Sequence, residues 1–140
     1  VKAGQIIVAS VEGSLQSCAL ITDEYDNALC STGFYVLDSK RINSETLLVL
    51  FKSKPIQELM KQRCSGTILT AITKDELLDM PLPEIEGQAQ LEIAKKVRES
   101  FALRNQSERL INLAKSVVEY AIEKDEAKAI KWLKEKGVDC

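Results

Sequence analysis

The sequence predicts an α+β protein in which a small, mixed, β-rich globule with short helices precedes a long C-terminal helix, coiled-coil-like or folded as a helical hairpin. Short β-branched runs alternate with turn residues over positions 5–37, and short amphipathic segments follow. Beyond Pro81 and Pro83 the chain contains no further proline. We therefore expect a globule over residues 1–83 and a helical dimerisation or spacer segment over residues 84–140.

The first elements are predicted to be strands. Residues 5–11 are short and β-branched, which favours a strand with both faces partly buried. Glu12-Gly13-Ser14 predicts a turn, and residues 16–22 predict a returning strand. After a polar connection, a third strand is expected over 28–31 and 33–37, broken by a bulge near Gly33.

From Ser44 the pattern favours helices. Asn43 or Ser44 is the expected N-cap of the first one. Pro55 suits the first turn of a second helix, which we expect to run to about Arg63 and to end at Ser65-Gly66. Residues 67–73 predict a β-like run and residues 74–78 a helical turn. Pro81 and Pro83 then hold an extended elbow.

The last helix is expected to begin near Glu86. Spacings of three and four residues link positions that are apolar at both ends of the helix and charged in the middle: Ala94, Val97, Phe101, Arg104, Glu108, Ile111, Lys115, Val118 and Ile122. This is a poor uniform coiled coil and indicates two contact zones, over 91–103 and 110–122. Residues 104–107 form a polar waist, at which the helix either continues or is interrupted by a kink or by a loop between two helices. A third apolar patch comprises Ala127, Ile130, Trp132 and Leu133.

A helix this long must pack either on its own globule or on a partner. The side chains that we expect at such a helix interface are Leu91, Ala94, Val97, Phe101, Leu103, Leu110, Ile111, Val118 and Ile122. The opening residues, Val1-Lys2-Ala3, also indicate a fragment or a trimmed chain.

Several function classes are disfavoured by composition. The chain has no histidine, so the usual general bases and the Ser-His and Cys-His nucleophile pairs are excluded. No phosphate-binding glycine motif or metal-ligand spacing occurs, and we expect neither a metal nor a cofactor. Cys18, Cys30, Cys64 and Cys140 form no C-x-x-C pair and are expected to be free thiols, although Cys18 and Cys30 could meet across a sheet. A neighbouring Arg63 could lower the pKa of Cys64. We therefore expect the protein to have no catalytic activity of its own.

Positive charge is concentrated in the middle of the chain. Residues 40–74 carry seven lysines and arginines against two glutamates, whereas residues 1–39 carry one lysine against five acids. Such a local excess either contacts phosphates or forms an ordinary solvated surface.

Several short matches, all in the same order, resemble the target recognition domain of type I restriction-modification specificity subunits. The matches cover roughly residues 4–125. They comprise the strand Gly4–Ser10 with its turn, Ser17–Leu20, Ser31–Leu37, the helical segments Leu47–Phe51 and Pro55–Met60, Ser65-Gly66, Ile72, Leu77, the elbow Met80–Pro83, Gln88 and Leu91.

That resemblance implies a non-catalytic DNA-binding specificity subunit or half-subunit. It would position a methyltransferase, and often a nuclease, on double-stranded DNA, and would form a homodimer through its long helix. By analogy, the phosphate candidates are Lys40, Arg41, Lys52, Lys54, Lys61, Arg63 and Lys74. The candidates for hydrogen bonds to bases or to the DNA backbone are Ser14, Gln16 and Thr67.

A rival interpretation is a protein-interaction adaptor with an oligomerising helix and no role on DNA, which the net charge of −2 favours. No apolar run approaches the length of a membrane helix, and no secretion leader is evident, so a cytoplasmic location is expected.

Overall fold

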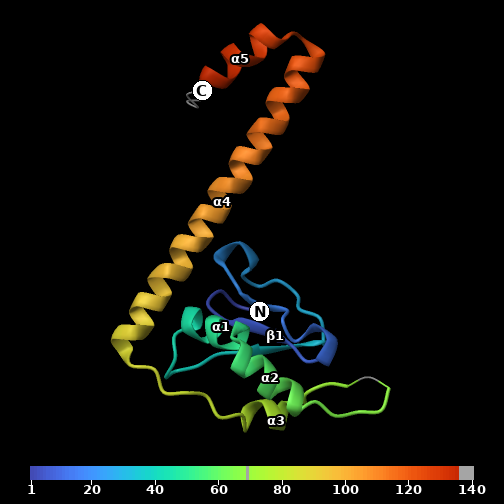
Figure 1. The fold of residues 1–140 in the computed structure, drawn as a ribbon, viewed down its shortest axis with the longest axis vertical. Helices are drawn as coiled ribbons and strands as arrows, with labels where there is room; N and C mark the ends of the chain where they lie inside the picture. Colours follow the sequence, from blue (N-terminus) through green and yellow to red (C-terminus); the bar gives the residue numbers. More distant parts are fainter. Residues whose placement is uncertain (69, 136–140) are drawn as a thin grey trace. The chain divides into compact units, whose positions relative to one another are not determined.

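The computed structural model describes residues 1–68 and 70–135 and has two compact units, of which the first is Val1–Val97 and the second begins at Arg98. The first unit contains a three-stranded antiparallel sheet and three short helices, and a long helix begins within it (Figure 1). The predicted α+β class is confirmed.

Strand β1 (Ile6–Ala9) forms the centre of the sheet, between β2 (Cys18–Leu20) and β3 (Phe34–Leu37). Val8 lies opposite Cys18 on one side and Tyr35 on the other. Two short 3-10 turns, η1 (Glu12–Ser14) and η2 (Asp23–Tyr25), occupy the connections. The three predicted strands are confirmed, but the segment 28–31 is not part of the third one. Asn27 adopts a φ of 63°, and the amide of Ala28 turns back to the carbonyl of Tyr25, so the chain leaves the extended conformation there.

The short helices begin where the capping residues and the proline in the sequence predict. Helix α1 (Ser44–Lys52) begins after Asn43, whose side-chain oxygen accepts a hydrogen bond from the amide of Thr46 at 2.8 Å. Helix α2 (Lys54–Gln62) carries Pro55 in its first turn, as expected, and α3 (Lys74–Leu78) is the predicted helical turn.

Helix α2 ends at Gln62 with Arg63 as its C-cap, which confirms the predicted run to about Arg63, but Ser65-Gly66 does not cap it. Gly66, with a φ of 135°, instead follows Ser65 into a loop closed by paired backbone hydrogen bonds between Ser65 and Ala71, each 3.0 Å long. The β-like run expected over 67–73 is limited to isolated bridges at Ala71, to Val11 and to Ser65.

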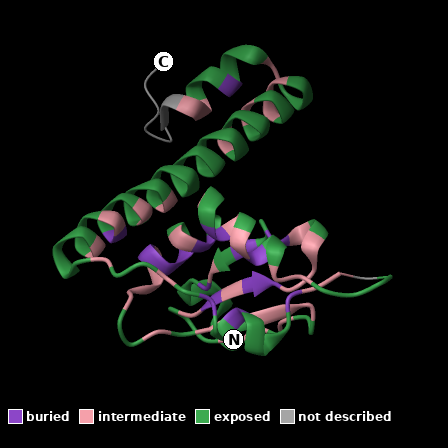
Figure 2. Ribbon diagram, turned by 60° about the horizontal axis from the view of Figure 1, so that its bottom comes forward, coloured by how far each residue is buried: buried purple, intermediate pink, exposed green. Residues whose placement is uncertain are grey.

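The core of the first unit lies between β1 and the short helices, where the buried residues concentrate (Figure 2). Its members include Ile6 and Val8 of β1, Phe51 of α1, Met60 of α2 and Ile72, none of which is more than 2% exposed. Full burial of one such side chain contributes roughly 1.5–3 kcal/mol to the stability of the unit.

Helix α4 (Gly87–Glu123) begins after the extended elbow and runs without interruption through the polar waist. Of the two alternatives left open at residues 104–107, the structure has the continuous helix. Arg104 and Glu108 form an ion pair of 3.2 Å at i and i+4, a spacing that supports a helix on its exposed face. The break falls instead between Glu123 and α5 (Glu126–Glu135).

In the second unit, Asp125 begins the new helix, because its carboxylate accepts a hydrogen bond from the amide of Lys128 at 2.9 Å. Tyr120 of α4 and Trp132 of α5 stack with ring centroids 5.9 Å apart, and Ala129 is only 1% exposed. Of the apolar patch predicted at the end of the chain, Trp132 contacts α4, whereas Ala127 and Ile130 are exposed. Among the described residues, no helix combines the length and apolarity needed to cross a bilayer.

Candidate nucleic-acid interface

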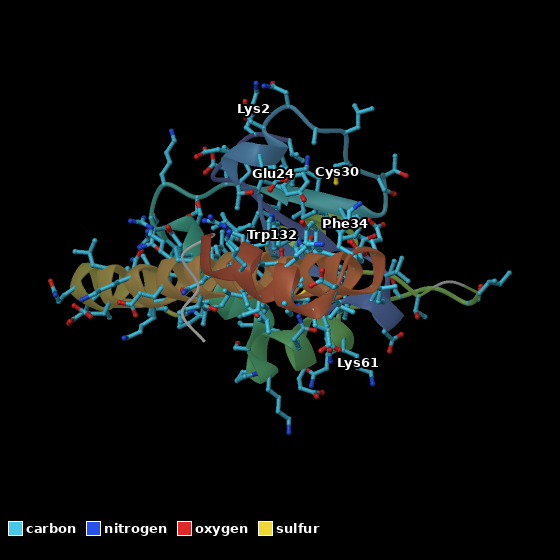
Figure 3. The ribbon with its side chains drawn as sticks, turned by 90° about the horizontal axis from the view of Figure 1, so that it is seen from above. Lys2, Glu24, Cys30, Phe34, Lys61 and Trp132 are labelled. Carbon is cyan, nitrogen blue, oxygen red and sulfur yellow. The ribbon has the colours of Figure 1, made fainter. Side chains whose placement is uncertain are left out.

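The side chains selected for DNA contact are dispersed over several parts of the first unit. Gln16 and Lys61 line a common open hollow of about 510 Å³ between η1 and α2. Lys54 precedes Lys61 by seven residues and is therefore on the same face of α2. Both lysines are exposed, and Figure 3 labels Lys61 on the outer side of α2. These three form the most coherent group among the predicted residues.

The walls of the hollow are held by contacts between distant parts of the chain. Leu15 is buried, and its carbonyl accepts a 3.0 Å hydrogen bond from Nε2 of Gln57 on α2. The amide of Glu12 donates to the carbonyl of Thr70 at 3.0 Å, and the hydroxyl of Thr70 donates to the carboxylate of Glu12. The turn is thus fixed both to α2 and to the 65–71 loop.

The charge of the hollow is mixed. Glu12 and Glu58 contribute carboxylates to its lining, and Lys61 contributes an ammonium group. In the part of the chain that the structure describes, neither Lys54 nor Lys61 forms an ion pair with a carboxylate. The lining of the hollow thus combines two carboxylates with one ammonium group.

The two small polar candidates are placed differently. The Ser14 hydroxyl donates a hydrogen bond to the carbonyl of Val11 at 3.2 Å, and Ser14 is half-buried. Its proton is therefore not available as a donor to a ligand. Thr67 is exposed in the loop that Ser65 and Ala71 close. Of these two, only Thr67 presents a hydroxyl without an intramolecular role among the described residues.

The guanidinium of Arg63 forms ion pairs with carboxylates in and directly after α3. Its Nη1 lies 3.1 Å from a carboxylate oxygen of Glu76 and 3.5 Å from one of Asp79, and it also contacts the carbonyl of Glu76. These carboxylates neutralise the guanidinium, which weakens its attraction for a phosphate. Lys74, in the first turn of the same α3, is exposed.

The remaining basic candidates lie apart from the hollow. Arg41 forms an exposed ion pair of 2.8 Å with Glu84 in the elbow, and Lys40 precedes it in an exposed stretch. Lys52, at the end of α1, is exposed but close enough to Cys18 to act on its pKa. Exposed pairs such as Arg41–Glu84 contribute little free energy and exchange readily for other ions.

Cys18, Cys30 and Cys64 are free thiols, as expected, whereas Cys140 lies outside the described residues. The alternative, in which Cys18 and Cys30 meet across a sheet, does not occur, because Cys30 lies outside the sheet. Desolvation, followed by the nearby carboxylate of Glu12, raises the pKa of Cys64. Arg63 does not lower it, because its guanidinium is directed toward the carboxylates of α3.

The helix-interface candidates fall into two groups. Ala94 is 3% exposed within the first unit, so it is not accessible to a partner, and Val97 and Phe101 are half-buried. Leu91 is exposed, as are five apolar side chains further along α4: Leu103, Leu110, Ile111, Val118 and Ile122. The members of the latter group follow one another at spacings of seven, one, seven and four residues, which puts them on one side of the helix.

The hydrogen bonds of Gln90 form a tertiary contact that lacks any local signal in the sequence. Oε1 of Gln90 accepts a 2.8 Å hydrogen bond from the amide of Asn43, and Nε2 of Gln90 donates to the carbonyls of Ile85 and Arg41 at 2.9 and 3.2 Å. Gln88, which the resemblance singles out, is exposed. Because the bonded residues are far apart in the chain, no spacing rule connects them.

Comparison of the sequence with known protein families and with characterised proteins gives no match.

Proposed function

We propose that the chain is a DNA sequence-recognition component, a specificity subunit or half-subunit of a type I restriction-modification system that acts in the cytoplasm. The single observation that carries this proposal is the surface formed by η1 and α2. There, the exposed Lys54 and Lys61 lie on one face of α2, and Lys61 lines a hollow together with Gln16 of the fixed turn. The order of the sequence matches supports the same assignment.

In this function, the globule binds DNA and performs no chemistry. The ammonium groups of Lys54 and Lys61 contact phosphates and thereby set the register of the globule on the duplex, while side chains of the turn approach the base edges. Lys40, Lys52 and Lys74 add further positive charge around the unit. A DNA methyltransferase subunit, carried by the assembly, supplies the catalytic activity.

The second unit supplies the assembly surface. Leu103, Leu110, Ile111, Val118 and Ile122 are each at least 49% exposed. Burial of such side chains against a second copy of the chain gives a homodimer with two globules. Symmetric pairing is the commonest arrangement of homo-oligomers, and it implies a DNA site with two equivalent halves.

The proposal is tested by the salt dependence of binding to random-sequence duplex DNA. If three phosphates are neutralised, the affinity falls about 40-fold between about 50 and about 200 mM salt. Lys54→Ala/Lys61→Ala reduces the logarithmic salt slope by about two, because two phosphate contacts are lost. The matched control is Lys124→Ala/Lys131→Ala, which removes two exposed lysines from the second unit and leaves the slope unchanged.

Mass in solution is recorded in the same samples, and a dimer is expected. Absence of binding, or binding that does not respond to salt, overturns the proposed DNA role. Salt-insensitive capture of a protein partner in its place supports the adaptor interpretation.

A further inference from the structure

The hollow between η1 and α2 has the wrong charge for a phosphate site. Glu12 and Glu58 both line it, and Lys61 is the one cation among its lining residues. Carboxylates repel phosphate oxygens and accept hydrogen bonds from amino groups. In the major groove, amino groups are presented by adenine and cytosine, whereas guanine presents two acceptors. The chemistry of the hollow therefore suits a base edge that carries an amino group.

Gln16 is the side chain in this hollow best suited to contact a base. It is exposed, and its amide makes no hydrogen bond within the described residues, so the oxygen and the nitrogen are both available. A primary amide offers one acceptor and two donors. Adenine offers the matching pair in the major groove, an N6 amino donor beside an N7 acceptor, and glutamine binds the two together.

The backbone beside Gln16 is anchored on both sides. Leu15 is 4% exposed, and the amide of Cys18 donates to the carbonyl of Gln16 at 2.9 Å. The amide of Ser17 donates to the carbonyl of Ser14 at 2.8 Å. A base-reading side chain must project from a rigid support, since looseness of the backbone would reduce discrimination between bases.

We propose that Gln16 reads an adenine in the major groove of double-stranded DNA, and that the hollow between η1 and α2 accommodates this base edge. Lys54 and Lys61 bind the flanking phosphates, and Glu58 disfavours guanine at the same position through repulsion of its O6 and N7. This inference rests on the proposed function, and it adds the residue that confers specificity and the base that it reads.

The experiment is selection of bound duplexes from a randomised library with the full chain, followed by affinity measurements on the selected site. Gln16→Ala is expected to weaken binding to that site by about 5- to 150-fold and to lose the preference at one A·T pair. Gln16→Glu shifts the preference at that position toward cytosine, because a carboxylate accepts from its N4 amino group. Gln62→Ala, an exposed glutamine of α2 outside the hollow, is the matched control.

Each outcome separates this inference from the proposed function. If the wild-type chain selects a site and Gln16→Ala selects the same one, Gln16 does not read a base, and the DNA role stands. Equal weakening on all sequences would also overturn the inference, because it identifies a backbone contact. If the wild-type chain binds no duplex, the proposed function fails and this inference fails with it. Circular dichroism of each variant confirms that the exposed substitutions leave the fold intact.

Discussion

Replacement of Gln90 by alanine tests how the beginning of α4 is attached to the globule. The side chain makes three hydrogen bonds, to the amide of Asn43 and to the carbonyls of Ile85 and Arg41, at 2.8, 2.9 and 3.2 Å. Its backbone carbonyl also accepts from Nδ2 of Asn43 at 3.1 Å, and that bond survives the substitution.

The expected loss follows from the net value of these bonds. Each contributes about 0.5–1.5 kcal/mol, and the site is only half-buried, so water partly replaces the lost partners. Alanine recovers a few tenths of a kcal/mol through its higher helix propensity, roughly 0.4 kcal/mol at most. The free energy of unfolding of the first unit should therefore fall by about 1–2 kcal/mol in Gln90→Ala.

Gln88→Ala is the matched control, since Gln88 lies in the same helical turn, is exposed and makes no side-chain hydrogen bond within the described residues. It changes the same residue type and gains the same helix propensity, so its stability should stay equal or rise slightly. Urea unfolding followed by circular dichroism measures both variants, and hydrogen exchange at the Asn43 amide reports the lost bond directly. Equal stabilities of Gln90→Ala and Gln88→Ala, with unchanged exchange at Asn43, would refute the reasoning.

Three further outcomes are expected. Met60→Ala, which opens a cavity at a fully buried position, should lower the free energy of unfolding by about 2–5 kcal/mol in urea titrations, whereas Val49→Ala at an exposed position should change it by less than about 0.5 kcal/mol. Burial raises the pKa of the Cys18 thiol from 9.0 to about 11, so the unfolded chain releases this proton at a lower pH than the folded chain. The contribution of Cys18 to the free energy of unfolding is therefore complete below pH 9.0 and declines as the pH rises toward 11. The variant Cys18→Ala should lack this decline. The hydrogen bond from the backbone amide of Lys128 lowers the pKa of Asp125 from 3.8. The stabilisation of α5 by the Asp125 carboxylate is therefore present above pH 3.8 and disappears as the pH falls below that value. Fluorescence of Trp132 should follow this titration, and Asp125→Asn should remove the pH dependence.

Local chemistry explains why parts of the fold could be predicted. Asn43 caps α1 and Pro55 opens α2 because both effects act within one turn of helix. The sequence left open whether the long helix is interrupted near Arg104. The helix continues there because Arg104 and Gln106 are good helix formers and Arg104 forms an ion pair with Glu108. The actual break follows from the cap at Asp125, a signal that was present in the sequence.

The candidate site was predictable only in part. Charge counting over residues 40–74 identified Lys54 and Lys61, but it could not separate them from Arg63, which Glu76 and Asp79 neutralise. Ion pairing depends on how α2 and α3 are placed, and that placement results from packing of the whole unit. The hollow itself joins residues of the first turn to residues of α2, which no periodicity connects.

The sequence by itself determined the α+β class, the three short strands, the starts of the short helices, the proline elbow and the long helix, because each depends on neighbours within a few residues. Tertiary structure alone decided that β1 lies between β2 and β3, that Gln90 binds Asn43, and that Gln16 and Lys61 share one hollow. The physical reason is that these contacts join segments far apart in the chain. Their free energy is gained only when the core between β1 and the helices has formed.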